Sequence, residues 1–220
     1  MTITTTDPEL DCPLCPRLVA LREKWQAAEP NWHNAPVSTF SAADPKLLIL
    51  GLAPGIRGAN ATGRPFTGDY AGDLLYATLK KYGFAEGEYL ARPDDGLTLV
   101  DTAISNAVRC VPPDNKPIGA EINACRPFLQ NTLKASPSLK VVMALGRIAH
   151  DTFLRTLGLR LAAYPFGHGA KHILPNWEGH NFILIDSYHC SRYNTNTGRL
   201  TTEMFESIFD KIRQTIAESN

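Results

Sequence analysis

The side chains of this chain that are best suited to bind metals or to transfer protons are its cysteines, a carboxylate in a glycine-rich loop and a histidine in a polar loop. The carboxylate belongs to Asp69 and the imidazole to His189. Thiolates bind metals, whereas a carboxylate and an imidazole can accept, donate or hold protons. Such groups act together only if the fold brings them together, so the elements around them have to be identified next.

The glycine-rich loop, residues 51–69, fails both common phosphate-binding motifs. Gly58 and Gly63 have the spacing of a P-loop, but Arg64-Pro65 stands where Lys-Ser/Thr is required. The dinucleotide motif G-x-G-x-x-G fails at once, because residues 51–53 read Gly-Leu-Ala. The loop also contains Pro, Phe, Asn and Asp, which favours a built ligand site over an ordinary surface loop.

The cysteines predict a metal site. Cys12 and Cys15 form a C-x2-C pair, and Cys110 and Cys125 are separated by fourteen residues. A zinc ribbon normally uses two C-x2-C pairs, so the wide second spacing favours an iron–sulfur cluster and leaves zinc as the alternative. Four protein ligands leave no open position, so the site would be structural. Unligated, buried cysteines are the remaining interpretation.

The polar loop that begins at His189 resembles a phosphatase motif only in part. The H-C-x5-R motif would place an arginine at position 196, but this residue is Asn196, and Arg199 follows three residues later. Without that arginine nothing neutralises a bound phosphate, so Cys190 is expected to be a packed core residue. The loop still carries groups that can hold phosphates without much net charge: Ser191, Asn194, Thr195, Thr197 and Arg199.

Length and composition indicate one α/β domain over residues 1–220, with residues 1–11 as a loose tail. The formal net charge is zero and the pI is near 7.0, so a nucleic-acid surface would have to be a local patch. Residues 1–9 do not resemble a signal peptide, and no apolar run approaches the length of a membrane span. We therefore expect a cytoplasmic monomer with reduced or ligated cysteines and no membrane contact.

Short apolar runs alternate with helical patterns, which predicts βαβ units and a mainly parallel sheet covered by helices on both faces. The expected strands are 47–50, 97–100, 140–145 and 182–185. The expected helices are 13–28, 71–82, 121–134, 146–157 and 202–217. Ligands of such sheets lie beyond the carboxyl ends of the strands, so the loops 51–69, 105–116 and 187–199 are expected to converge on one cleft.

Four blocks of sequence resemble the uracil-DNA glycosylase superfamily and, within it, the iron–sulfur-containing type 5 branch. They are GLAPG at 51–55, GRPFTGD at 63–69, NAVRC with PP at 106–113, and HCSRYN with TGRLT at 189–201. Their order, together with the cysteine spacing, covers the chain from Cys12 to about Thr202. The resemblance implies a three-layer αβα fold with a central, mainly parallel four-stranded sheet. It also implies excision of uracil from DNA and, in this branch, of other deaminated bases such as hypoxanthine.

The resemblance implies a role for each matching residue. Cys12, Cys15, Cys110 and Cys125 match the ligands of a structural 4Fe-4S cluster. Phe66 matches the aromatic residue that stacks on a flipped base, Asn106 the amide that reads its edge, and His189 the residue that hydrogen-bonds the base O2. The remaining base-binding positions are Ala53, Pro54 and Gly55, and the DNA-binding positions are Ser191, Arg192, Tyr193, Asn194 and Arg199.

The first block departs from the better-known branches, which place a polar residue just after its first glycine to position water. Here Leu52-Ala53 offers no polar group, as in type 5. Asp69 is the best substitute, and we expect it to orient water or stabilise the cationic sugar. Its alternative role is to cap a helix that begins near Tyr70, and the two roles are compatible.

Two other functions remain open at this point. One is a non-catalytic iron–sulfur protein that binds DNA or senses damage, and the other is a hydrolase of small nucleosides. Another branch of the superfamily traps DNA covalently and has a basic insertion before its catalytic histidine. No such insertion precedes His189, so we expect turnover.

Overall fold

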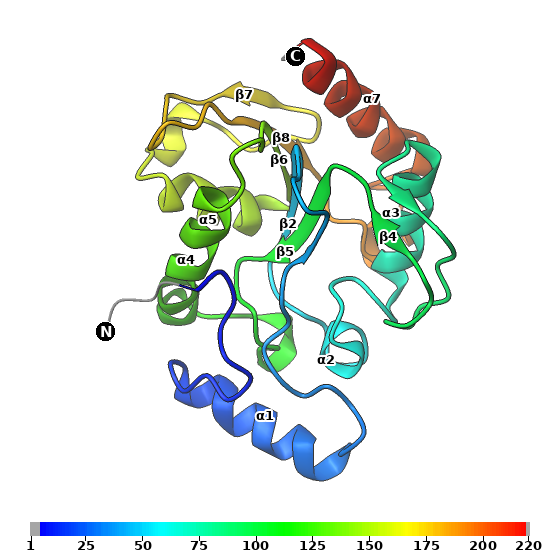
Figure 1. Cartoon of the computed structure of the whole chain (residues 1–220), viewed down its shortest axis with the longest axis vertical. Coiled ribbons are helices and arrows are strands. Elements are labelled where there is room, and N and C mark those ends of the chain that lie inside the picture. The colour runs from blue at the N-terminus through cyan, green and yellow to red at the C-terminus, as the bar shows by residue number, and fades with distance from the viewer. Residues whose placement is uncertain (1–4, 219–220) are drawn as a thin grey trace.

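The computed structural model of the chain describes residues 5–218 and is built on a six-stranded sheet with the order β1-β5-β2-β6-β8-β7 (Figure 1). The four inner strands run parallel and are β5 (Thr102–Asn106), β2 (Leu47–Gly51), β6 (Val141–Leu145) and β8 (Ile183–Ser187). The outer strands β1 (Phe40–Ser41) and β7 (Lys171–Ile173) pair antiparallel with β5 and β8. The predicted parallel four-stranded sheet is confirmed, with a short antiparallel strand added at each edge.

One of the four expected strands is wrong. Residues 97–100 do not enter the main sheet, because β4 (Thr98–Leu99) pairs with β3 (Ala85–Glu86) in a separate two-stranded sheet. The sheet strand is β5, whose five residues are all buried although three are polar. The hydroxyls of two of them have partners: Thr102 donates to the carbonyl of Val100 at 2.8 Å, and Ser105 shares a 3.1 Å hydrogen bond with Thr39, 66 positions away. This internal satisfaction allows a polar sequence to form a buried strand.

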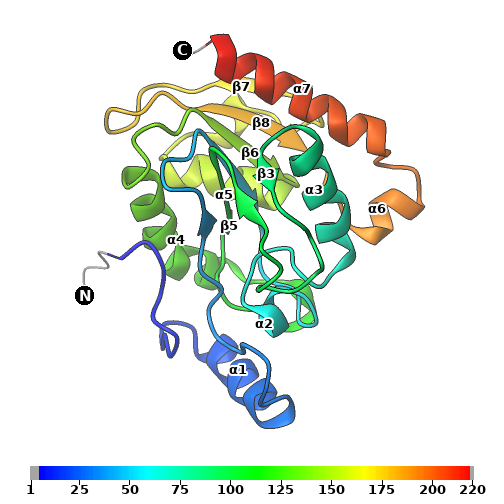
Figure 2. The same cartoon turned by 45° about the vertical axis from the view of Figure 1, so that its right-hand side comes forward.

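Helices cover both faces of the sheet, as predicted (Figures 1 and 2). Alternate residues of β2 point to opposite faces. Leu47 and Ile49 join the core formed with α3 (Tyr70–Lys81) and α7 (Thr202–Glu218). Leu48 and Leu50 join the core formed with α4 (Gly119–Lys134) and α5 (Arg147–Thr156). The layers therefore confirm the three-layer αβα architecture.

The remaining elements are short or peripheral. Helix α1 (Pro16–Ala28) lies at the end of the molecule opposite α7 (Figures 1 and 2). The short helices are α2 (Ala59–Thr62), α6 (Arg192–Asn196), and the 3-10 turns η1 (Pro113–Asn115) and η2 (Leu161–Ala163). Within residues 5–218, none of the helices combines the length and apolar character needed to cross a bilayer.

The described part of the expected loose tail is anchored. The carboxylate of Asp7 accepts hydrogen bonds from the backbone N–H and the hydroxyl of Thr39, at 2.9 and 3.1 Å. It also lies 3.2 Å from the guanidinium of Arg109, whose side chain is 1% exposed. Buried arginine requires a counter-charge, which explains why this segment is fixed. Residues 1–4 lie outside the described residues.

Candidate active site and cysteine cluster

A pocket of about 410 Å³ opens beyond the carboxyl ends of β2, β5 and β8. It is lined by residues from all three loops that the sequence predicted to converge, so that prediction is confirmed. The lining includes Ala53, Pro54, Gly55, Phe66 and Asp69 from the first loop, Asn106 and Asn115 from the second, and His189, Ser191 and Arg192 from the third.

The floor of the pocket depends on the register between β2 and β5, which sets Gly51 opposite Asn106. A Cβ atom at Gly51 would overlap the amide oxygen of Asn106 and lie 2.7 Å from Cζ of Phe66. Glycine is therefore required here for the close approach of these two side chains. The Oδ1 atom of Asn106 is buried and has no hydrogen-bond partner among the described residues.

Phe66 is held in an unusual backbone conformation, with φ of 53°. Hydrogen bonds to the loop carbonyls fix it there: the hydroxyl of Tyr76 donates to Pro65 at 2.6 Å and that of Tyr89 to Phe66 at 3.3 Å. The ring of Phe66 is buried, and its centroid lies 6.0 Å from that of His189 with a 32° angle between the planes. The two rings thus form adjoining parts of the pocket.

Beneath this loop, Arg64 makes a buried ion pair. Its guanidinium donates twice to the carboxylate of Asp95, at 2.8 and 2.7 Å, and its Nε donates to the hydroxyl of Thr67 at 2.8 Å. The side chains of Arg64 and Asp95 are 6% and 0% exposed. The bidentate geometry holds the segment on both sides of Phe66 in place.

Asp69 both caps a helix and lines the pocket. It is the N-cap of α3, and its Oδ1 accepts from the backbone N–H of Gly72 at 3.1 Å, which confirms the capping role. Burial raises the pKa of the Asp69 carboxyl above its ordinary value, and hydrogen bonds from the backbone of Gly72 and Ala71 oppose this only in part. A Cβ atom at Gly58 would lie 2.6 Å from Oδ2 of Asp69, so glycine lets the loop close over the carboxylate.

His189 enters the pocket from the end of β8. Burial lowers the pKa of its imidazole, so the ring is neutral near pH 7. Its backbone carbonyl accepts from the side-chain amide of Asn194 at 2.8 Å, and Ser191 caps α6 by accepting from the backbone of Asn194 at 3.4 Å. The turn after His189 is therefore fixed by its own side chains.

The five predicted DNA-binding residues take different positions. Ser191 and Arg192 line the pocket, and the guanidinium of Arg192 lies 5.1 Å from the ring centroid of Tyr70. Tyr193 is 72% exposed. The side-chain amide of Asn194 donates to the carbonyl of His189 within the turn. Arg199 lines an adjoining pocket.

Several residues that line the pocket were not predicted from the sequence. Arg57, Tyr70 and Asn115 also contribute to the pocket. Asn115 has a positive φ of 55° in the turn between Pro113 and Pro117. Asparagine is one of the few residues that adopts this conformation readily. An asparagine in a turn bounded by prolines was therefore the sequence pattern that could have indicated this lining residue.

The four candidate ligand cysteines line one small apolar cavity, together with Leu18 and Phe128. Cys12 and Cys15 precede α1, Cys110 follows β5, and Cys125 lies in α4. None of the four forms a disulfide, and the backbone N–H of Arg109 donates to Sγ of Cys125 at 3.4 Å.

Four thiols from three separate segments of the chain, brought to one place, are a ligand set suited to zinc or to an iron–sulfur cluster. Cys190 is separate and fully buried, as expected.

Comparisons with known proteins identify the family of the chain. The model of the Uracil DNA glycosylase superfamily matches residues 37–213. The chain is 46% identical to the type-5 uracil-DNA glycosylase of Thermus thermophilus, over 88% of this chain and 89% of that protein. It is 39% identical to the type-5 uracil-DNA glycosylase of Mycobacterium leprae, over 92% of both.

Among solved structures, the crystal structure of WT Pedobacter heparinus SMUG2 aligns with a TM-score of 0.47 and 15% identity, covering 78% of this chain and 77% of that one. A likeness at this level does not by itself define a shared fold. The family match over most of the chain and the identity to full-length relatives do define the family: the chain belongs to the uracil-DNA glycosylase superfamily, in its type-5 branch.

Proposed function

We propose that this protein is a DNA glycosylase that flips uracil out of DNA and hydrolyses its N-glycosidic bond, leaving an abasic site. The observation that carries the proposal is the buried, unpartnered Oδ1 of Asn106 on the pocket floor. A buried acceptor left unpaired costs about 1–3 kcal/mol, so a ligand that donates to it gains that energy. Uracil offers an N–H beside a carbonyl, which matches the acceptor and donor of one amide.

Phe66 would stack on the flipped base. Extracting a base from the duplex costs a few kcal/mol, and stacking and edge hydrogen bonds must offset that cost. The ring of Phe66 adjoins Asn106 through Gly51, so one base can contact both side chains. Ala53, Pro54 and Gly55 would complete the base-binding wall.

His189 would donate to O2 of the base. Negative charge develops on uracil as the glycosidic bond breaks, and a neutral imidazole still has one N–H to give. Donors aimed at developing charge contribute about 3–4 kcal/mol in comparable sites. His189 is only partly exposed, which limits the access of water to that hydrogen bond.

Asp69 would act on the sugar side of the bond. As a carboxylate it can orient the attacking water or stabilise the oxocarbenium-like sugar. Leu52 and Ala53 line the same pocket and offer no polar side chain that could replace it. A less polar pocket would also tolerate other deaminated bases such as hypoxanthine.

The DNA backbone would be contacted by Ser191, Arg192, Tyr193, Asn194 and Arg199. The exposed phenol of Tyr193 and the guanidinium of Arg192 lie on α6, directly after His189. Their position beside the pocket supports the proposal that they contact a DNA strand that enters it. The chain's zero net charge means that such local cations must supply the attraction.

Cys12, Cys15, Cys110 and Cys125 would hold a structural 4Fe-4S cluster. The cluster would supply no chemistry to the reaction, because four protein ligands fill its coordination. The cysteines themselves would fasten α1 to α4 and to the segment after β5. We further propose that residues 1–220 form one domain that works as a cytoplasmic monomer on DNA, without membrane contact, which agrees with five unpaired thiols.

One assay tests the activity. Duplex and single-stranded oligonucleotides carrying uracil, hypoxanthine, xanthine or thymine are incubated with the holoprotein and treated with alkali. Strand breakage at uracil but not at thymine is expected. Binding without breakage would instead support a damage-sensing protein, and cleavage of free deoxyuridine a nucleoside hydrolase. A protein–DNA band that survives denaturant would contradict turnover.

A further inference from the structure

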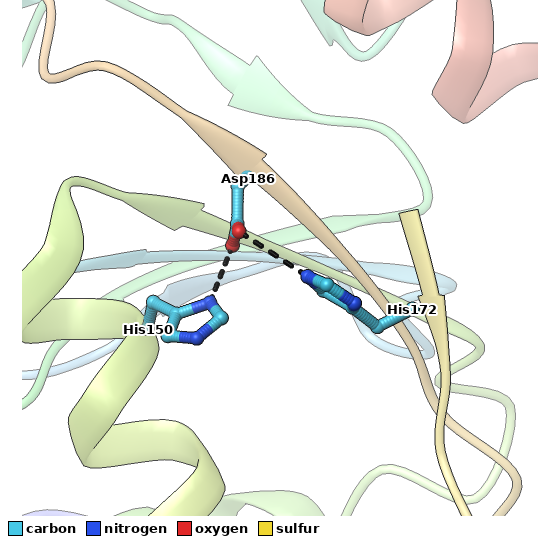
Figure 3. Close-up of side chains that lie close together, drawn as sticks. All are labelled: His150, His172 and Asp186. Carbon is cyan, nitrogen blue, oxygen red and sulfur yellow. Dashed lines mark hydrogen bonds and ion pairs between the residues drawn. The ribbon is translucent and has the colours of Figure 1, made fainter. Parts of the chain in front are cut away.

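A buried cluster of three titratable side chains lies outside the proposed base pocket. Asp186 of β8 lies between His150 of α5 and His172 of β7 (Figure 3). Asp186 and His150 are 0% and 1% exposed, and the side chain of His172 is 13% exposed. Burying a carboxylate this completely is costly unless its charge is compensated, so the cluster requires an explanation.

Two imidazoles and a carboxylate whose ligand atoms lie within 4.8 Å of one another could suggest a zinc site. The distances argue against it. Nδ1 of His150 lies 2.7 Å from Oδ1 of Asp186, whereas ligands at 2.0–2.1 Å from one tetrahedral zinc ion lie about 3.3 Å apart. A separation of 2.7 Å is that of a charge-assisted hydrogen bond.

The second ring nitrogen of His150 fixes the protonation of the pair. Its Nε2 lies 2.9 Å from the carbonyl oxygen of Tyr164, which can only accept a hydrogen bond. That nitrogen must carry hydrogen, so a proton between Nδ1 and the carboxylate makes the pair an imidazolium with a carboxylate. Burial lowers the pKa of His150, but the hydrogen bond and charge of Asp186 outweigh it and raise the pKa overall.

The pair holds the loop formed by residues 164–170 against β8. His150 binds the start of this loop at Tyr164, and the other carboxylate oxygen of Asp186 accepts from the backbone N–H of Gly167 at 3.3 Å. The backbone of Asp186 completes the attachment, with hydrogen bonds to Gly169 at 2.8 Å and Ala170 at 3.0 Å. The loop is thus attached at its beginning, middle and end.

The same loop supports the residue before His189. Nδ1 of His168 accepts from the backbone N–H of Tyr188 at 3.1 Å, and the two rings stack with centroids 4.9 Å apart. Desolvation lowers the pKa of His168, which keeps its ring neutral and able to accept. The backbone of Tyr188 continues directly into His189.

We infer that His150 and Asp186 are positioning residues, which hold the loop 164–170 against Tyr188 and so fix the imidazole of His189 in the base pocket. This inference rests on the proposed function, because it takes His189 as the group that faces the base. The other charged or titratable groups near His150 are Asp151 on its own helix, His172 on β7, and Arg147, which lies over Phe166 of the loop.

The test compares Asp186→Asn with two controls in the holoprotein. His172→Gln changes the neighbour whose Nε2, 3.5 Å from Oδ2, is not aligned for a hydrogen bond. Leu133→Ala removes a buried side chain from α4 and controls for lost stability. Single-turnover uracil excision and affinity for product DNA are measured for each, together with the melting temperature.

We expect Asp186→Asn to slow excision about 10- to 100-fold with little change in DNA affinity, since a displacement of about 1 Å can cost on the order of 10²-fold. His172→Gln should retain the wild-type rate. Leu133→Ala should lose at least as much stability as Asp186→Asn, as judged by its melting temperature, and should still excise uracil at the wild-type rate. Excision by Asp186→Asn within about twofold of wild type would overturn the inference, as would an equal slowing in Leu133→Ala.

Nitrogen-15 NMR of the histidine rings provides a readout that does not depend on activity. Wild type should show both ring N–H groups of His150 at neutral pH, and Asp186→Asn should lose the Nδ1 proton. One bound zinc per chain, absent from Asp186→Asn, would overturn the inference in favour of a metal site. A wild type that excises no uracil would refute the proposed function. An active wild type with an unaffected Asp186→Asn would refute only the positioning role of His150 and Asp186.

Discussion

Gly51 and Asn106 are partners across β2 and β5, and the missing side chain of Gly51 makes the space into which Asn106 and Phe66 converge. Parallel pairing fixes this relationship, because a shift of one residue would turn Asn106 away from the pocket. The amide of Asn106, which we propose reads the base, is therefore positioned by a strand register, which is more rigid than a loop.

Gly51→Ala tests this packing. The added methyl group would overlap Oδ1 of Asn106 and crowd Phe66, so we expect single-turnover uracil excision to fall on the order of 100-fold. Gly119→Ala is the matched control, because a Cβ there meets nothing within 4 Å. Equal rates in the two variants would show that the floor of the pocket is not as tight as the structure indicates.

Asp69→Asn separates the capping role of Asp69 from the catalytic role that we propose for it. Asparagine can still cap α3 with its side-chain oxygen, so the protein should stay folded. Loss of the charge should slow single-turnover excision about 100-fold, in line with typical acid–base contributions. Asp73→Asn, one turn further along the same helix and exposed, should be near wild type. Wild-type activity in Asp69→Asn would remove this carboxylate from the mechanism.

The raised pKa of Asp69 also predicts an effect of pH on stability. A carboxyl whose pKa is raised by folding favours the folded state only while protonated, so its ionisation destabilises the protein as pH rises through the folded pKa. Asp69→Asn should therefore melt at a higher temperature than wild type at neutral pH, and the difference should shrink toward acidic pH. Calorimetry across that range measures it, and a constant difference would contradict the prediction.

The pair formed by Arg64 and Asp95 predicts a large loss of stability on Asp95→Asn. Breaking a buried ion pair by removing one partner leaves an uncompensated charge and costs about 3–5 kcal/mol. Urea unfolding measures the change. Asp94→Asn is the control, because its pair with Arg92 is exposed at 78% and 59% and should contribute less than about 1 kcal/mol.

The cysteine site predicts a coloured protein with about four iron atoms per chain. Cys15→Ser should lose iron and visible absorption and melt at a lower temperature, because α1 loses its attachment to α4. Cys190→Ala should retain both, since Cys190 is buried away from the other four thiols. A colourless wild-type protein prepared without oxygen would contradict the cluster.

Much of the site could be predicted from sequence because its residues stand next to strand ends. The apolar runs of β2, β6 and β8 identified the strands, and the polar residues that follow them necessarily meet at one sheet edge. Strand β5 was not predicted in this way, because its sequence is polar. Thr102 and Ser105 can be buried only because hydrogen-bond partners in the fold satisfy their hydroxyls.

The contacts that sequence could not predict join residues remote in the chain. His150 and Asp186 are 36 positions apart and belong to different layers, so no local pattern links them. The attachment of Asp7 to Thr39 and Arg109 also joins distant residues, which is why the sequence predicted a loose tail over residues 1–11. Such pairs are selected by the assembled fold rather than by a local preference.

The placement of the four cysteines has a consequence for biosynthesis. Cys12 and Cys15 leave the ribosome early, but their partners Cys110 and Cys125 follow only after β2 and β5 have been made. If the four hold one cluster, it can be completed only after the residues of the first two central strands have been synthesised. Cluster insertion would therefore wait until residue 125 of the 220 has left the ribosome.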